Sequence, residues 1–288
     1  MSKDDPDWLD RTLFPFTSRL LQVDGNKVHY IDEGSGPTLL LLHGNPTWSF
    51  LYRHLVRRLA PRFRCVALDY PGFGLSKAAP GYGYTPREHS RVLESFVDAL
   101  DLSDFSLMVQ DWGGPIGLGF AGRRPERVRS LVVGNSFAWP ATAGMKGFSH
   151  VVGNRVSRYL ITRHNLLARW LIPAGTNRKL TEAELRAYMG PFPTAASRLP
   201  AWIFARQIRE SANYLSEVEA GLAKLRDKPA LIVWGDADGA FRLADRDRFA
   251  SLLPRHRIVD LPGAKHFIQE NAPDQIASAI LDWQSGQP

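Results

Sequence analysis

Short apolar runs that alternate with helical segments are the feature that most restricts the fold of this chain. Each run is brief and is followed at once by a turn or a helical pattern, which is typical of buried strands in a parallel sheet. The runs cover residues 38–42, 65–68, 105–109, 130–133, 230–234 and 257–261, and residues 27–31 resemble a preceding antiparallel strand. Apolar residues recur at helical spacing over residues 49–60, 87–100, 114–122, 244–253 and 273–283. This order predicts an α/β fold with a mostly parallel sheet covered by helices on both faces.

The alternation stops between residues 136 and 226, where no strand-like run occurs. Helical patterns cover residues 182–189 and 202–211, and they are interrupted by Pro173, Pro191, Pro193 and Pro200. We therefore expect a core domain made of residues 1–135 and 227–288, with residues 136–226 inserted as a helical cap. Such a cap would lie over the carboxyl ends of the strands, where open α/β folds bind ligands.

The basic charge of the chain does not by itself indicate a nucleic-acid or membrane partner. Thirty-six Lys and Arg against 29 Asp and Glu give a net charge of +7. Basic residues alternate with apolar or acidic ones, as on solvated helix faces, and form no dense block. We expect neither nucleic acid nor a membrane as a partner.

Three further features favour a cytoplasmic protein. The longest purely aliphatic run covers residues 39–42, far short of a membrane span. The first ten residues are acidic and lack the apolar segment of a secretory signal. Cys65 is the single cysteine, so no intramolecular disulfide can form.

The segment at residues 105–114, FSLMVQDWGG, carries the sharpest local signal. A predicted strand runs into Asp111 and is followed by paired glycines and a helix, which is the form of a nucleophile elbow. Gly113 stands where a small residue lets the helix approach. The helix N-terminus would favour the ionised carboxylate of Asp111. An ordinary Asp N-cap would give the same local pattern.

Two other segments favour the elbow. Residues 39–48, LLLLHGNPTW, match the oxyanion loop after the third strand of α/β-hydrolases, so the backbone N–H groups of Asn45 and Trp112 would form an oxyanion hole. Asp238 follows a later strand, and His266 lies on the loop after the last strand. Nucleophile, acid and histidine thus occur in the α/β-hydrolase order.

An Asp nucleophile predicts a particular reaction. A carboxylate can displace a leaving group from saturated carbon and form an alkyl-enzyme ester. Water activated by His266 would then hydrolyse the ester, with Asp238 stabilising the imidazolium. Asn45 and Trp112 can also offer side-chain N–H groups to a departing anion.

These motifs resemble those of the haloalkane dehalogenases, within the α/β-hydrolase superfamily. The resemblance rests on HGNPTWSFLYR at 43–53, DYPGFGLS at 69–76, VQDWGGPIGL at 109–118 and AKHFIQE at 264–270, and it is greatest to the third subfamily. It implies an eight-stranded, mostly parallel sheet with a cap, and carbon–halogen hydrolysis that yields a primary alcohol, a halide and a proton. It also implies Asp111, His266 and Asp238 as the triad, Asn45 and Trp112 as the halide donors, no cofactor, and self-association.

Some alternatives stay open at this point. Asp236 also follows the strand at 230–234, and the family pattern favours Asp238 over it as the acid. The second subfamily takes its acid from the end of the strand before the cap, but Asn135 stands there and cannot ionise. The cap tryptophans Trp139, Trp170 and Trp202 are expected in the pocket lining or the core rather than as halide donors.

The nearest rival enzyme is an epoxide hydrolase, which uses the same triad and two cap tyrosines. The candidate tyrosines are Tyr159, Tyr188 and Tyr214. A related luciferase-type oxygenase would keep much of the same set. The match to G-x-G-x-x-G at 117–122 lies inside a predicted helix and is a weak sign of dinucleotide binding. The eight histidines show no paired spacing for a metal, and none is expected.

Overall fold

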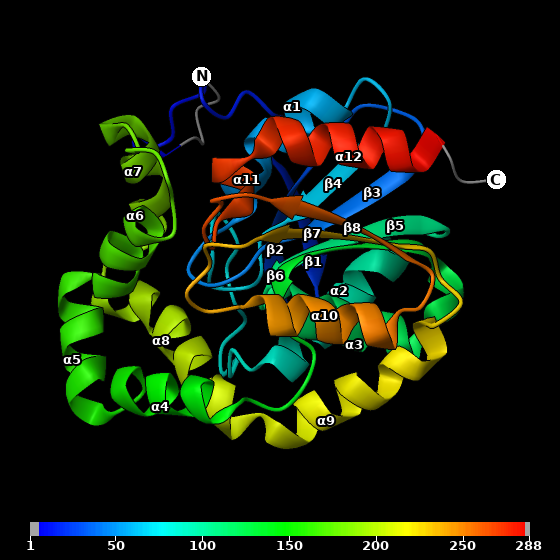
Figure 1. The fold of residues 1–288 in the computed structure, drawn as a ribbon. Helices are drawn as coiled ribbons and strands as arrows, with labels where there is room; N and C mark the ends of the chain where they lie inside the picture. The colour runs from blue at the N-terminus through cyan, green and yellow to red at the C-terminus, as the bar shows by residue number, and fades with distance from the viewer. Residues whose placement is uncertain (1–5, 286–288) are drawn as a thin grey trace.

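The computed structural model describes residues 6–285, and within them it contains the predicted eight-stranded, mostly parallel sheet (Figure 1). The strand order is β1-β2-β4-β3-β5-β6-β7-β8, with β1 antiparallel to β2, β2 antiparallel to β4, and every other pair parallel. The strands are β1 (Arg19–Val23), β2 (Asn26–Glu33), β3 (Thr38–Leu42), β4 (Arg64–Leu68), β5 (Phe105–Asp111), β6 (Val128–Ser136), β7 (Ala230–Gly235) and β8 (His256–Leu261).

Helices cover both faces of this sheet. In Figure 1, α1 and α12 lie on one face and α2, α3 and α10 on the other. The core helices are α1 (Arg53–Leu59), α2 (Pro86–Ala99), α3 (Gly113–Arg123), α10 (Leu243–Leu252), α11 (Ile268–Asn271) and α12 (Pro273–Ser285), with 3-10 turns at Ser49–Tyr52, Pro125–Arg127 and Leu222–Leu225. Every described helix falls short of the length and apolar character needed to cross a bilayer.

The centre of the sheet is fully enclosed. Every residue of β5 is buried, as are four of the five residues of β3. Covering both faces removes the polar–apolar alternation of a half-exposed strand, which is why these strands read as continuous apolar runs. The carboxyl end of β5 therefore provides a rigid position from which a side chain can project.

Only helices connect β6 to β7. They are α4 (Ala143–Val152), α5 (Arg155–His164), a π-helical turn at Leu167–Leu171, α6 (Ile172–Ala174), α7 (Glu182–Met189), α8 (Ala195–Glu210) and α9 (Ala212–Gly221). In Figure 1, α4 to α8 gather to the left of the sheet, and α9 runs back beneath the core. The division at residues 136 and 226 stays a prediction, which this uninterrupted helical run supports.

Two local features differ from the sequence-based expectations. Strand β1 was not predicted, because its exposed edge position gives the sequence no regular alternation. It pairs with β2 through a turn in which Asp24 and Gly25 both have positive φ, 49° and 76°. Such turns match the twist of an antiparallel hairpin.

Pro200 is the second difference, since it lies inside α8 rather than ending a helix. An internal proline removes one helical hydrogen bond. Pro200 is buried against the loop after β4, where a Cβ on Gly72 would lie 2.9 Å from its Cγ. This contact with the core offsets the lost bond and places α8 beside the end of the sheet.

Candidate active site

Asp111 ends β5 at a sharp turn into α3. Its φ is 50°, in the left-handed region that residues with a side chain rarely adopt. Ser136 Oγ donates a hydrogen bond of 2.6 Å to the Asp111 carbonyl oxygen and helps to fix the turn. The residue is 8% exposed, so its carboxylate is enclosed but reachable. A strained strand-to-helix turn of this kind is a nucleophile elbow.

Two glycines permit the close packing of the elbow. A Cβ on Gly113 would lie 2.3 Å from the carbonyl oxygen of Leu42, at the end of β3. A Cβ on Gly44, in the loop after β3, would lie 2.3 Å from Asp111 Oδ1. The loop and the helix therefore approach the carboxylate this closely only because both positions are glycine.

Two backbone N–H groups converge on the Asp111 carboxylate. The N–H of Asn45 donates to Oδ1 at 2.8 Å, and the N–H of Trp112 also hydrogen-bonds this carboxylate. They come from the loop after β3 and from the residue after the elbow, where the sequence predicts the oxyanion hole. Such donors stabilise negative charge that develops on the bound oxygen.

Asn45 and Trp112, whose backbone N–H groups bind the carboxylate, also carry side-chain N–H groups. Asn45 Nδ2 donates to the carbonyl oxygen of Ala201 in α8 at 3.1 Å, which leaves its second N–H for another acceptor. Among residues 6–285, Trp112 Nε1 has no hydrogen-bond partner. Each side chain therefore keeps an N–H group that is not used within the described residues.

The structure brings Asp111, His266 and Asp238 together. His266 Nδ1 lies 2.9 Å from Asp238 Oδ2, and His266 Nε2 lies 3.7 Å from Asp111 Oδ2. Asp236 instead accepts a bond of 2.6 Å from the backbone N–H of Gly263 and does not reach the imidazole. The carboxylate that can orient His266 is thus Asp238, the one that the family pattern favours.

Burial and charge shift the pKa of each of these groups. Burial raises the pKa of Asp111, although His266 and the two backbone N–H groups oppose it. Burial alone would lower the pKa of His266, but Asp238 and Asp111 outweigh it and raise the pKa overall. Burial would raise the pKa of Asp238, yet the charge and hydrogen bond of His266 lower it. Asp238 therefore stays ionised as a partner for the imidazole.

Aromatic rings surround this polar group. Trp112 packs against Phe137 at a centroid distance of 5.0 Å and against Phe204 of α8 at 5.2 Å. Phe241 stacks on Phe137 at 5.5 Å and lies 5.6 Å from the His266 ring. An apolar surrounding strengthens the electrostatic interactions inside it and suits an apolar substrate.

Comparisons with known proteins agree with this geometry. The family model for the alpha/beta hydrolase fold matches residues 37–273. Haloalkane dehalogenase 2 of Mycobacterium bovis is 46% identical over 276 residues, which cover 95% of this chain and 96% of that protein. This chain belongs to the haloalkane dehalogenase family.

Two more relatives of similar length extend the comparison. The crystal structure of the haloalkane dehalogenase DbeA from Bradyrhizobium elkani has a TM-score of 0.87 at 26% identity, and the match covers 94% of this chain and 98% of that one. A protein of Shewanella oneidensis named cis-3-alkyl-4-alkyloxetan-2-one decarboxylase is 34% identical, over 93% of this chain and 88% of that protein. This chain is thus also similar in sequence to a protein named for a different reaction.

The cap tyrosines do not form the pair that an epoxide hydrolase needs. Tyr188 OH donates to Glu270 Oε1 at 2.5 Å, and Tyr214 OH donates to the carbonyl oxygen of Pro115 at 2.8 Å. Tyr159 is 65% exposed. The first two hydroxyls are already engaged and the third side chain faces solvent, so none is placed to polarise an epoxide oxygen over Asp111.

The cap tryptophans contact other groups than the carboxylate. Trp139 is buried against Phe249 at 4.7 Å, and the guanidinium of Arg206 lies over the ring of Trp202 at 4.8 Å. Trp170 is 72% exposed. Trp139 and Trp202 are therefore packed in the interior, as expected, whereas the expectation was wrong for Trp170, which faces solvent.

Two residues near the triad were given no role from the sequence. Asn135 Nδ2 donates to Asp238 Oδ2 at 2.9 Å and to the carbonyl oxygen of Gly235 at 3.0 Å. Gln110 Nε2 lies 3.3 Å from His266 Nε2 and donates to the His266 carbonyl oxygen at 3.2 Å. The sequence signal available for each was a polar residue inside an otherwise apolar strand.

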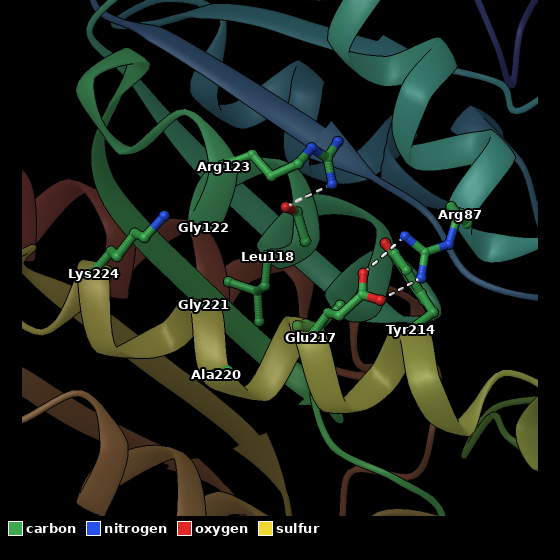
Figure 2. Close-up of a pocket in the computed structure, with 11 residues that line it drawn as sticks. Arg87, Leu118, Gly122, Arg123, Tyr214, Glu217, Ala220, Gly221 and Lys224 are labelled. Atoms are coloured by element: carbon green, nitrogen blue, oxygen red, sulfur yellow. Dashed lines mark hydrogen bonds and ion pairs between the residues drawn. The ribbon is translucent and has the colours of Figure 1, made fainter.

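The G-x-G-x-x-G match serves helix packing. Gly119 and Gly122 of α3 face α9, and a Cβ on Gly122 would lie 3.0 Å from the Cα of Gly221. Figure 2 shows the pocket between these helices, where Arg87 pairs with Glu217. No triad residue lines this pocket, and the glycines lie in the middle of a helix rather than at a phosphate-binding turn.

One group of potential metal ligands occurs among the described residues, namely His54, Glu184 and Glu270. Arg53 hydrogen-bonds both glutamates, and Arg178 does so as well. Two guanidinium charges already balance the two carboxylates. The group therefore joins the core to α7 as an ion network, and it does not resemble an open cation site.

Proposed function

We propose that this chain is a haloalkane dehalogenase that converts halogenated aliphatic compounds and water to a primary alcohol, a halide ion and a proton. The observation that carries the proposal is a carboxylate, rather than a hydroxyl, at the elbow. Asp111 Oδ1 accepts the N–H of Asn45, the N–H of Trp112 also bonds the carboxylate, and His266 lies near Oδ2. A carboxylate nucleophile suits displacement at saturated carbon.

Asp111 Oδ2 is the oxygen that we expect to attack. Oδ1 accepts the N–H of Asn45, whereas Oδ2 faces His266 Nε2 at 3.7 Å. A bond forms between Oδ2 and the substrate carbon while the carbon–halogen bond breaks, and its electron pair leaves with the halide. The side-chain N–H groups of Asn45 and Trp112 would stabilise the charge that develops on the halide.

Water then hydrolyses the ester. His266 Nε2 takes a proton from the water, whose oxygen attacks the Asp111 carboxyl carbon. The negative charge develops on Oδ1, which already lies in the oxyanion hole. Collapse of the tetrahedral intermediate breaks the carboxyl carbon–Oδ2 bond, releases the alcohol and restores Asp111. Asp238 would hold the Nδ1–H tautomer and stabilise the imidazolium.

The test is halide release from a panel of chloro-, bromo- and iodoalkanes. Wild type and Asp236→Asn should release halide, while Asp111→Ala and Asp238→Asn should lose most of their activity. Asp236 is a matched control because it lies two residues from Asp238 but bonds Gly263 instead of the histidine. Equal activity in the Asp111→Ala variant would contradict the proposal.

The covalent step has its own readout. In His266→Phe, alkylation should proceed and ester hydrolysis should stop, so that intact-protein mass increases by one alkyl group. In a single turnover of wild type in isotopically labelled water, the label should enter Asp111 rather than the alcohol. Label in the first alcohol released would indicate direct attack of water on the substrate.

A second candidate activity is the decarboxylation of a β-lactone, because the relative from Shewanella oneidensis is named as a decarboxylase of such a ring. Attack of Asp111 at the ring carbon bonded to oxygen would release a carboxylate in place of a halide. Loss of carbon dioxide with expulsion of Asp111 would then leave an alkene. A cis-3,4-dialkyl-oxetan-2-one and an epoxide therefore belong in the panel. Alkene formation faster than halide release would favour this candidate.

We also propose several features that accompany the family assignment. The similarity to the third subfamily suggests self-association, and the single cysteine, buried and free, suits a reducing cytoplasm. Residues 136–226 would form the cap over Asp111. The bond from Asn45 to Ala201 joins this cap to the halide site, so cap packing would help to set substrate preference.

A further inference from the structure

A second pocket lies on the cap, away from Asp111, and it is strongly basic. Its volume is about 480 Å³. We call it the arginine pocket, after Arg163, Arg169, Arg186 and Arg198, which line it together with His164. Apolar side chains, including those of Trp8 and Phe192, form the rest of its wall. No residue in this lining is acidic among the residues that the structure describes.

The charges in the arginine pocket are poorly balanced. Arg198 donates to the backbone carbonyl oxygens of Phe192, Thr162, Arg163 and Pro193. Within residues 6–285, the guanidinium groups of Arg163 and Arg169 have no acidic partner, whereas Arg186 lies 4.0 Å from Glu182 and also interacts with the charge of Asp10. Burial lowers the pKa of Arg198, and the charges of Arg169 and Arg163 lower it further. An anion would relieve this repulsion.

The segment that carries Arg163 and Arg169 is devoid of acidic residues. Between Glu126 and Glu182 the sequence has no Asp or Glu, but it has nine Lys and Arg. Helix α5 and the π-helical turn after it belong to this segment. This segment therefore carries only positive charge, and it would attract an anionic surface at long range.

Large apolar side chains are exposed beside the pocket. Val156, Tyr159 and Leu160 are 70%, 65% and 41% exposed. These three residues precede Arg163 on α5 by seven, four and three residues, respectively. The four side chains therefore share one face of the helix. Trp170, which is 72% exposed, follows Arg169 directly. Exposed apolar groups gathered in this way mark an interaction surface.

We propose that this face binds an anionic membrane surface, with a lipid phosphate in the arginine pocket and the exposed side chains of α5 and Trp170 entering the interface. Arginine matches phosphate geometry, and tryptophan and tyrosine favour the level of the lipid headgroups. A helix with basic and apolar groups on its outer side suits peripheral binding in the plane of the interface.

Other occupants fit this face less well. Two copies docked through it about a twofold axis would bring four arginines against four arginines without an acidic group to separate them. Nucleic acid would use the arginines, but Val156 and Leu160 would gain nothing from its phosphates. The sequence did not point to a membrane because these arginines are spread along residues 163–198, and only the fold brings them to one pocket.

Vesicle co-sedimentation tests the proposal with the full-length protein. Vesicles of phosphatidylcholine alone are compared with an equimolar mixture of phosphatidylglycerol and phosphatidylcholine. Wild type should bind the anionic vesicles selectively, and salt should weaken the binding. The double variant Arg163→Gln with Arg169→Gln should bind about 25-fold more weakly, from about fivefold for each basic residue lost near an anionic surface. Trp170→Ser should also weaken binding.

The matched control is Arg226→Gln with Arg257→Gln, which removes two exposed charges outside the arginine pocket instead. This control should bind like wild type. Halide release in solution should be unchanged in all these variants, so the outcome does not depend on the proposed reaction. Unfolding curves check that each variant is folded.

Several results would overturn the proposal. They are the absence of vesicle binding, equal binding to both vesicle types, or equal loss in the control variant. Saturable binding of inorganic phosphate that is lost in the Arg163 and Arg169 variant, without vesicle binding, would indicate a free-phosphate site. Sedimentation without lipid that Trp170→Ser abolishes would show that a second copy covers the face.

Discussion

Gln110 contacts His266 twice, with its Nε2 3.3 Å from His266 Nε2 and bonded to the His266 carbonyl oxygen at 3.2 Å. Gln110 is fully buried on β5, next to Asp111. The rigid strand therefore positions both the nucleophile and the imidazole. Because the amide lies beside the lone pair that must accept a proton from water, it would help to fix the ring for ester hydrolysis.

Replacing Gln110 by Ala should slow ester hydrolysis about tenfold, which corresponds to the loss of one or two hydrogen bonds to the ring and its backbone. Alkylation does not use His266 as a base, so its rate should change little. Rapid-quench measurements of halide and alcohol separate the two steps. Gln22→Ala, on the exposed edge strand, is the control. A uniform loss in both steps would mean that Gln110 acts on the whole site.

Replacing Asn135 by Gly should impair the triad acid. Asn135 Nδ2 donates to Asp238 Oδ2 at 2.9 Å, and its Oδ1 accepts the N–H of Gly235 at 2.7 Å. Glycine tolerates the φ of 25° at this position, so the change mainly removes these bonds. We expect a loss of about 1–3 kcal/mol in stability from the unpaired buried groups, and slower hydrolysis.

Asn165→Gly is the matched control for this variant, since Asn165 also has a positive φ, 54°, but lies at the end of α5. Thermal unfolding and the hydrolysis rate should be measured for both. If Asn135→Gly hydrolyses the ester as fast as Asn165→Gly does, Asn135 has no part in holding Asp238.

The hydrolysis rate should decrease at acidic pH, because a protonated His266 cannot accept the proton of water. In the resting enzyme, burial would lower the pKa of His266. The charges of Asp238 and Asp111 outweigh burial and raise this pKa above 6.5. In the alkyl-enzyme the Asp111 charge is absent, so the pKa of His266 should be lower there than in the resting state. The rate of alkyl-enzyme decay measured against pH gives the pKa of His266 in the alkyl-enzyme. A nuclear magnetic resonance titration gives its pKa in the resting enzyme, and the two values are compared. Equal pKa values in the two states would show that the charge of Asp111 does not raise the pKa of His266.

The elbow was predictable because its signal is local. A buried strand, Asp111 and Gly113 occur within nine residues of each other. Few structures other than an elbow combine this pattern with the φ of 50° found at Asp111. The choice between Asp236 and Asp238 was not fixed locally, because both follow β7 within three residues. Only the fold of the next loop, where Gly263 binds Asp236, separates them.

Other features depend on segments that meet only in the folded chain. In the sequence, Gln110 is one more residue of a buried strand. Its contact with His266 exists only in the fold, where the loop after β8 brings the two residues together. Pro200 predicted a helix end, and its contact with Gly72 explains why α8 continues. The arginine pocket likewise combines residues of α5, α7 and α8 that no single stretch of sequence places together.

Replacing Arg53 by Met should destabilise the protein by about 3–5 kcal/mol, because it removes the more deeply buried of the two guanidinium groups that balance the carboxylates of Glu184 and Glu270. Arg53 is fully buried and bonds Glu184 of α7 at 2.8 Å and Glu270 of α11. Denaturant unfolding measures the change. Arg62→Met, at an exposed position, should have little effect. Similar losses in both variants would mean that the ion network does not stabilise the fold.

The same network should make the protein sensitive to acid. Burial would raise the pKa of Glu184, but the hydrogen bond from Arg178, the backbone of Thr181 and the charge of Arg53 lower it to about 2, from 4.5. The pKa of Glu270 is lowered as well, since Arg53 and Tyr188 outweigh its burial.

A carboxyl with a lower pKa when folded stabilises the protein above its unfolded pKa and loses that contribution as the pH decreases through the folded value. The free energy of unfolding should therefore be steady near neutral pH and should decrease below about pH 4.5, towards pH 2. Urea unfolding at a series of pH values measures this slope, and Glu184→Gln should reduce it. An unchanged slope in that variant would assign the acid sensitivity to other carboxylates.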